Sequence, residues 1–294
     1  MSFIDLNKIA DTYARDRGAN LKSVIIKEML HLDILRALSN SDLSSQIVFQ
    51  GGTALRLCYQ GGRYSEDLDF VLADENLIFD KSLFREFERT FADSMLKKYN
   101  LQSELVYPKN DDGLVQKWVA KILLPIENRK EKINIEICKI PSYDNSVKSI
   151  ENFYSSAASD QLDKILLKVE SLEEILADKI VAFGAREYLK YRDIWDIKWL
   201  GDKNIAIDSD LISKKISNYN IENFDEKIKN KLDILNNENL DEAFKNEMQR
   251  FLSPNLLAQV VKFDFFKDIK KAVNVVCEDY LGDQSKNVRK RRRL

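Results

Sequence analysis

The sequence predicts an α+β fold in two parts: a mixed sheet flanked by helices over residues 1–155, followed by a helical domain over residues 156–294. Three observations support this division. Apolar and polar residues alternate strictly from Lys132 to Cys138, which is typical of a half-buried strand. From Leu172 onward, apolar residues recur every three or four positions, as in amphipathic helices. The polar, serine-rich stretch 141–160 lies between these patterns, so we place the boundary near residue 155.

The composition is that of a globular protein without a membrane span or a strongly basic surface. The chain has 294 residues, of which 44% are hydrophobic, and its net charge is −2. No apolar window of about 18 residues occurs, and the N-terminus lacks the pattern of a signal peptide. Cys58, Cys138 and Cys277 are odd in number and widely spaced, which favours reduced thiols. We therefore expect a cytoplasmic protein.

Two helices are expected before the first strand, at residues 4–16 and 20–39. The single histidine, His31, lies on the second of them. No other histidine is present to complete a zinc pair, and no glycine-flanked serine is present to form a hydrolase triad. We interpret His31 as a packing or surface residue.

A glycine pair follows the apolar run at residues 47–49, and it begins a short helix-like segment. Gly51 and Gly52 allow a ligand to approach the backbone closely, because glycine has no Cβ. The helix start near Thr53 offers free N–H groups and the positive end of the helix dipole. This arrangement suits a phosphate group.

Two aspartates follow about fifteen residues later, in the pattern Asp67-Leu68-Asp69. Side chains at positions i and i+2 of a strand point to the same face, so the two carboxylates are expected to project together. Carboxylate oxygens suit a hard divalent cation, Mg²⁺ or Mn²⁺ in its place, shared with phosphate oxygens. A phosphate cradle followed by this pair predicts a nucleotidyl-transfer site.

Further strands and a helix are expected after the aspartates. Residues 80–99 form an amphipathic pattern, and residues 102–107, 116–124 and 132–138 are strand-like. Glu136 lies on the last of these strands, on the face opposite an isoleucine stripe. By itself, such a residue is ordinarily a solvated side chain.

The string GGTALR…RYSEDLDF resembles the signature of the DNA polymerase β-type nucleotidyltransferase superfamily. More narrowly, it is similar to the AbiEii/AbiGii toxins of bacterial type IV toxin–antitoxin and phage abortive-infection systems, which are related to the mycobacterial MenT toxins. The similarity covers the N-terminal half and a second block near residues 174–200. It implies a polymerase-β-like domain with a third carboxylate on a later strand, at the position of Glu136. There Glu136 would orient or deprotonate the attacking hydroxyl, or help to hold the metal with Asp67 and Asp69.

The second block contains two cations and two acids at helical spacing. Lys179 and Arg186 are seven residues apart and share a helix face, while Asp193 and Asp196 are i, i+3 neighbours. On the residues alone, the cations could be surface side chains, and Asp193 could cap a helix start. The resemblance implies that Lys179 reaches the nucleotide phosphates and that Asp193 supports it, with Arg186 and Asp196 as further candidates.

The nucleotide site implied by the resemblance also includes the loop before the aspartates. Arg63 and Ser65 are expected to shape this loop, and Arg56 either packs or contacts the nucleotide. The predicted nucleotide-binding residues are Gly51, Gly52, Thr53, Arg56, Ser65, Lys179 and Arg186.

The resemblance implies a Mg²⁺-dependent toxin that transfers a nucleoside monophosphate from an NTP to an acceptor hydroxyl. The expected acceptor is RNA, in particular the 3′ end of tRNA, and the outcome is growth arrest. A cognate antitoxin is expected, a DNA-binding regulator that forms no stable complex with the toxin. Two alternatives stay open: an antibiotic or protein hydroxyl as acceptor, and a non-catalytic nucleotide-binding module.

The remaining sequence predicts helices and carries no further chemical motif. They are expected near residues 208–217, 221–235, 239–251, 255–262 and 264–281. The tail has five basic residues in a row, Arg289 to Arg293. It could hold an RNA backbone or be a disordered, solubilising end.

Overall fold

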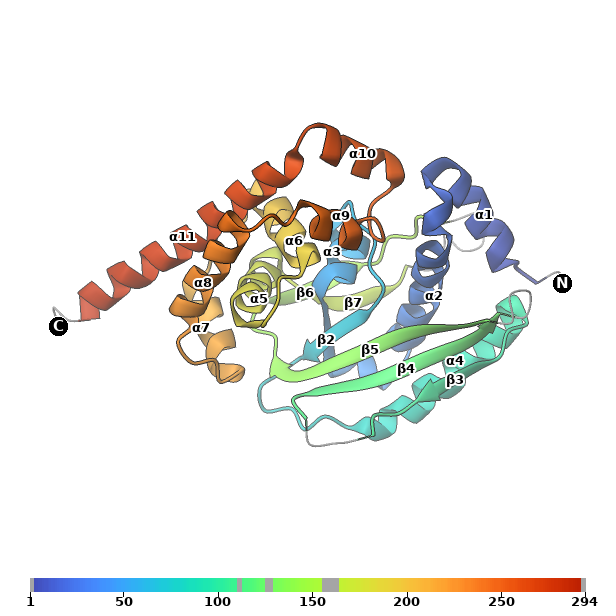
Figure 1. Cartoon of the computed structure of the whole chain (residues 1–294). Coiled ribbons are helices and arrows are strands. Elements are labelled where there is room, and N and C mark those ends of the chain that lie inside the picture. The colour runs from blue at the N-terminus through green and yellow to red at the C-terminus, as the bar shows by residue number, and fades with distance from the viewer. Residues whose placement is uncertain (1–2, 110–112, 125–128, 155–163, 292–294) are drawn as a thin grey trace. The chain divides into compact units, whose positions relative to one another are not determined.

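The computed structural model describes residues 3–109, 113–124, 129–154 and 164–291, with side chains of the last helix described as far as Asp283 (Figure 1). The chain forms two compact units, Met1–Glu170 and Ser171–Leu294. The first unit contains a seven-stranded sheet and the second is helical, so the α+β class is confirmed. The first unit extends past the expected boundary at residue 155, because a strand at Leu166–Glu170 still belongs to the sheet.

The sheet is mixed and has the strand order β3-β4-β5-β2-β1-β7-β6. Within it, β2 is antiparallel to β1 and parallel to β5, which places β2 between the other two near the centre of the sheet. The strands are β1 Ile47–Gln50, β2 Leu68–Leu72, β3 Ser103–Val106, β4 Val115–Leu124, β5 Arg129–Pro141, β6 Asn145–Ser149 and β7 Leu166–Glu170.

The helices of the first unit are α1 Leu6–Arg17, α2 Lys22–Ser39, α3 Gly51–Tyr59 and α4 Phe84–Tyr99. Helix α4 covers one face of the outer strands, since Phe84 stacks on Trp118 of β4 with ring centroids 4.0 Å apart. Every second residue of β4 from Gln116 to Leu124 is buried with Trp118. The other face of β4 therefore carries the more exposed residues between them.

His31 is fully buried on α2, so it is a packing residue. Its Nε2 lies 3.0 Å from the carbonyl oxygen of Glu66, in the loop that leads to β2. Burial lowers the pKa of His31 to about 4, which keeps the imidazole neutral near pH 7.

The second unit consists of seven helices among the described residues. They are α5 Leu172–Ala185, α6 Tyr191–Asp202, α7 Ser209–Asn218, α8 Phe224–Asn237, α9 Asp241–Met248, α10 Pro254–Lys262 and α11 Phe265–Arg291. Ser171 caps α5 through its hydroxyl, which accepts from the Glu174 amide at 3.1 Å. Gly184 lets α8 approach α5 closely, because a Cβ there would lie 2.6 Å from the ring of Phe224.

The end of the chain is more helical than its sequence suggests. Helix α11 continues to Arg291, well past residue 281. The basic side chains of the tail, Arg289 to Arg293, lie outside the described part of the chain. No described helix has the length and apolar character needed to cross a membrane.

Candidate active site

The first residue of α3, Gly51, lies against the carboxylate of Asp69. A Cβ built on Gly51 would be 2.9 Å from Asp69 Oδ2, and the φ angle of Gly51 is +77°. Both the space and the backbone conformation therefore favour glycine. The N-terminal end of α3 is thus next to a negatively charged group, which the positive end of the helix dipole stabilises.

The second glycine accommodates a buried arginine. A Cβ on Gly52 would lie 2.2 Å from Nη2 of Arg63, so any larger residue would displace the guanidinium. Arg63 is 5% exposed, and its Nη1 donates to the carbonyl oxygen of Tyr64 at 2.9 Å. The glycine pair therefore makes room for two side chains of the 63–69 segment, Arg63 and Asp69.

Asp67 is held by one contact to its backbone and another to its side chain. The Thr53 hydroxyl donates to the Asp67 carbonyl oxygen, which ties α3 to the start of β2. Asn134 of β5 donates from Nδ2 to Asp67 Oδ1 at 2.7 Å and so orients the carboxylate. Thr53 was a predicted site residue, whereas Asn134 was not.

The strand register brings the three predicted carboxylates to one face of the sheet. Asp69 and Glu136 are direct partners in the parallel pair of β2 and β5. Asp67 lies just before β2, and its contact with Asn134, two residues before Glu136 on β5, places its carboxylate on the same face. On the other side of Glu136, Lys117 of β4 is its antiparallel partner, and the Lys117 Nζ is 3.0 Å from Glu136 Oε1. Lys117 is a site neighbour that only the strand register reveals.

The three acids of this face offer the donor type of a divalent-metal site. Asp67, Asp69 and Glu136 supply only carboxylate oxygens, the ligand type that Mg²⁺ and Mn²⁺ prefer. A divalent cation bound between these acids would offset their negative charges. Lys117 reaches only Glu136 in this set and is itself half-exposed, at 47%.

Arg56 has contacts typical of a packing residue. Its guanidinium donates to both carboxylate oxygens of Glu28, at 3.0 and 3.2 Å. It also lies over the rings of Tyr64 and Phe153, at 4.7 and 4.4 Å from their centroids. Ser65 is buried in the segment between Arg63 and Asp67.

In the second unit, the four predicted charged residues form one ion-pair cluster. Lys179 Nζ lies 2.9 Å from Asp193 Oδ1 and 2.9 Å from Asp196 Oδ2. Arg186 pairs with the other oxygen of Asp193. Both aspartates are nearly buried, so α6 presents them to Lys179 of α5 from a fixed position. Asp193 and Asp196 lie on one helix, α6, as their spacing predicts, whereas Arg186 is the C-cap of α5 and does not continue the helix of Lys179.

A third cation, Lys190, joins this cluster at the start of α6. Burial lowers the pKa of Lys190, and repulsion from Arg186 lowers it further, while Asp193 raises it. Lys190 therefore adds a positive charge close enough to Arg186 and Asp193 to interact with both. This added positive charge suits an anionic ligand.

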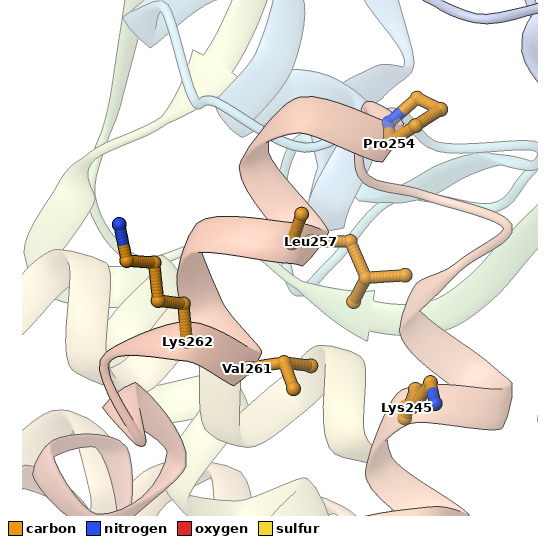
Figure 2. A pocket seen from close by; sticks show the side chains of 6 residues that line it. Lys245, Pro254, Leu257, Val261 and Lys262 are labelled. Carbon is orange, nitrogen blue, oxygen red and sulfur yellow. The ribbon is translucent and has the colours of Figure 1, made fainter.

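A separate hollow of the second unit lies between α9 and α10 (Figure 2). Leu257 and Val261 project from α10 toward Lys245 of α9, and Pro254, Ala258 and Lys262 complete the lining. None of the predicted site residues lines this hollow.

A comparison with protein-family models matches residues 33–275 to the family described as nucleotidyl transferase AbiEii toxin, type IV toxin–antitoxin system. This match covers most of the chain. The chain belongs to the AbiEii family. The AbiEii protein is therefore a nucleotidyltransferase toxin, a class that uses NTP and a divalent metal and has an antitoxin partner.

Solved structures support the fold of this AbiEii protein. MenT4, a nucleotidyltransferase toxin from Mycobacterium tuberculosis H37Rv, aligns with a TM-score of 0.52 at 16% identity, covering 95% of this chain and 98% of MenT4. A Helicobacter pylori protein assigned provisionally as a nucleotidyltransferase aligns with a TM-score of 0.51 at 18% identity, covering 88% of this chain and 95% of that chain. A search of curated protein sequences gives no match.

Proposed function

We propose that this AbiEii protein transfers a nucleoside monophosphate from an NTP to a hydroxyl of RNA, at the 3′ end of tRNA, in a Mg²⁺-dependent reaction. The observation that carries the proposal is the pairing of Asp69 with Glu136, next to the glycine start of α3. Acids and a helix N-terminus occur together there. Transfer of this kind would arrest growth and, during infection, abort phage production.

The groups of the first unit bind the reacting end of the NTP. Asp67 and Asp69 would hold the metal, which when bound neutralises charge on the phosphate oxygens. The N–H groups at the start of α3, beginning with Gly51, would bind phosphate oxygens. Asn134 and Thr53 keep Asp67 in place for this role.

Glu136 would take the proton of the acceptor hydroxyl while the hydroxyl oxygen attacks the α-phosphorus. A new oxygen–phosphorus bond forms, the bond between the α-phosphorus and the bridging oxygen breaks, and pyrophosphate leaves. Glu136 has one oxygen paired with Lys117, so its second oxygen is the one offered to the hydroxyl.

The charged cluster of the second unit would bind the outer phosphates of the NTP. Lys179 is the main phosphate ligand, with Arg186 beside it. Asp193 and Asp196 orient the Lys179 ammonium group by accepting from it on two sides. Arg186 and Lys190 add positive charge beside Lys179, which favours binding of a phosphate there.

The antitoxin implied by the family would be a DNA-binding regulator that acts without a stable complex. Co-purification of the two proteins expressed together tests this part. A stoichiometric complex that survives gel filtration contradicts it.

The decisive experiment incubates the protein with each radiolabelled NTP and with total tRNA, a protein extract or aminoglycosides. We expect label on RNA with wild type, loss of label with Asp69→Asn, and full labelling with Asp74→Asn, an exposed aspartate two residues after β2. Sequencing of RNA 3′ ends then identifies the added nucleotide. Label on the drug or on protein alone, or NTP binding without transfer to any acceptor, overturns the proposal.

A further inference from the structure

The solvent-facing side of β4 and β5 carries a row of lysines, which we call the lysine face. It consists of Lys117 and Lys121 on β4 and Lys130 and Lys132 on β5. Residues that alternate with these lysines along the two strands are buried, for example Trp118 and Ile133. Since α4 covers the Trp118 side through Phe84, the lysines point away from that helix. Figure 1 shows β4 and β5 as a long strand pair alongside α4.

The register of the two strands places like charges opposite each other. Lys121 and Lys132 are direct partners in the antiparallel ladder. Such a pair is unfavourable in a sheet, so folding does not account for it. Glu104 of β3 lies 3.6 Å from Lys121, but Glu104 is 60% exposed and offsets the charge only in part. Lys130 and Lys132 are both exposed to solvent.

The lysine face is continuous with the carboxylate site. Lys117 contacts Glu136, which is the neighbour of Asp69 across β2 and β5. Moving along β4 and β5 away from Glu136, the cations recur at every second or fourth residue. Two residues of a strand span about 6.6 Å, a separation comparable to that of successive phosphates in an extended nucleic-acid strand.

We propose that the lysine face binds the sugar-phosphate backbone of the acceptor, a nucleic-acid strand whose terminal hydroxyl lies at Glu136. This inference rests on the proposed function of the carboxylate site. Lysine ammonium groups neutralise phosphates and release their counterions. The chain carries a net charge of −2, so these cations are a local feature of the sheet. Contacts to phosphates position a strand without reading its bases.

The test neutralises three lysines together, as Lys121→Gln, Lys130→Gln and Lys132→Gln. Lys117 is left intact because it touches Glu136. The matched control removes three exposed cations of α4, as Arg85→Gln, Arg89→Gln and Lys97→Gln. Binding of a fluorescent single-stranded oligoribonucleotide and of fluorescent tRNA is measured by anisotropy, without NTP, at several salt concentrations. Binding to vesicles that contain phosphatidylserine is measured as a third comparison.

We expect the lysine-face variant to bind RNA at least tenfold more weakly at low salt. The slope of log affinity against log salt should fall by about 2, which corresponds to three lost phosphate contacts on a single strand. The α4 control should retain the affinity and slope of wild type. Equal losses in both variants, no RNA binding by wild type, or binding to vesicles but not to RNA each overturn the inference.

Transfer of labelled nucleotide and NTP binding, measured on the same proteins, separate this inference from the proposed function. If the lysine-face variant binds RNA normally while wild type transfers nucleotide to RNA, the lysine face is not the RNA-binding surface, and the proposed function still holds. If wild type binds RNA through the lysine face but transfers no nucleotide, the RNA-binding surface is supported and the proposed transfer reaction is contradicted.

Discussion

Asp69 and Glu136 lie side by side on parallel strands, although 67 positions separate them in the sequence (136 − 69). This relationship joins a carboxylate at the start of α3 to a carboxylate that contacts Lys117. The first is suited to hold a metal, and the second has an oxygen available for a proton. The pairing also makes the two roles separable by mutation.

Replacing Glu136 with glutamine removes the proton acceptor but keeps the shape of the side chain. We expect the rate of nucleotide transfer to fall by about 10²- to 10⁴-fold, as for the loss of a general base. The matched control is Glu104→Gln, which removes another sheet glutamate whose partner is a lysine. Single-turnover transfer is the measurement, and equal rates for the two variants would contradict the role of Glu136.

Gly51→Ala should destabilise the first unit and displace Asp69. The new Cβ would lie 2.9 Å from Asp69 Oδ2 at a positive φ, so we expect a loss of about 1–3 kcal/mol in the free energy of unfolding. Urea denaturation measures this loss. The control, Gly62→Ala, has nothing within 4 Å of its new Cβ and should be nearly neutral. A harmless Gly51→Ala would show that the close approach to Asp69 is not needed.

Lys179→Met should affect both stability and NTP binding, because Asp193 and Asp196 would lose a shared partner while nearly buried. Removing one member of a buried ion pair typically costs about 3–5 kcal/mol, and the Arg186 contact to Asp193 should reduce that figure here.

The double variant Lys179→Met, Asp196→Asn separates the two effects. We expect it to recover much of the stability, measured by chemical denaturation, but none of the NTP affinity, measured by calorimetry. Recovery of NTP binding in the double variant would mean that Lys179 acts only by neutralising the aspartates.

The lowered pKa of His31 predicts how the free energy of unfolding depends on pH. Its folded-state pKa is lowered from 6.5 to about 4, so the unfolded chain binds the proton more readily than the folded chain. The stability associated with neutral His31 is fully present above pH 6.5 and is lost as the pH falls toward 4. Between pH 6.5 and 5, this loss should be about 2 kcal/mol.

The comparison is between wild type and His31→Leu, in urea denaturation at pH 7 and pH 5. The chain has one histidine, so the difference in their pH dependence reports this residue. We expect a smaller decrease on acidification for the variant. Parallel decreases would show that His31 is accessible to protons in the folded state.

Local patterns in the sequence predict much of the fold and the acids of the site. Alternation identifies β5, and the two-residue spacing of Asp67 and Asp69 predicts their common face even though β2 begins only at Leu68, because both signals are local in the sequence. The spacing of Lys179 and Arg186 likewise reflects one helical stretch, although Arg186 is already the C-cap of α5.

Residues that depend on strand register could not be found in this way. Asn134 and Lys117 reach Asp67 and Glu136 only through pairings between strands. Arg56 has its partner, Glu28, on another helix, so its packing role is not visible in the local sequence. Periodicity within an element carries no information about which elements become neighbours.

The first compact unit ends at Glu170, later than the polar stretch near residue 155 predicts, for a related reason. The strand Asn145–Ser149 reads as a polar linker, because it lies at the sheet edge and contains one large apolar residue, Val147. Strand β7 then pairs with it, which keeps the chain in the first unit up to Glu170.

The guanidinium of Arg63 fills the space beside Gly52, since a Cβ on Gly52 would lie 2.2 Å from it. Evolution can therefore enlarge position 52 only after position 63 has been shortened. A larger residue at position 52, with Arg63 still present, would disrupt the loop before β2. Substitution of Arg63 is therefore expected to precede substitution of Gly52.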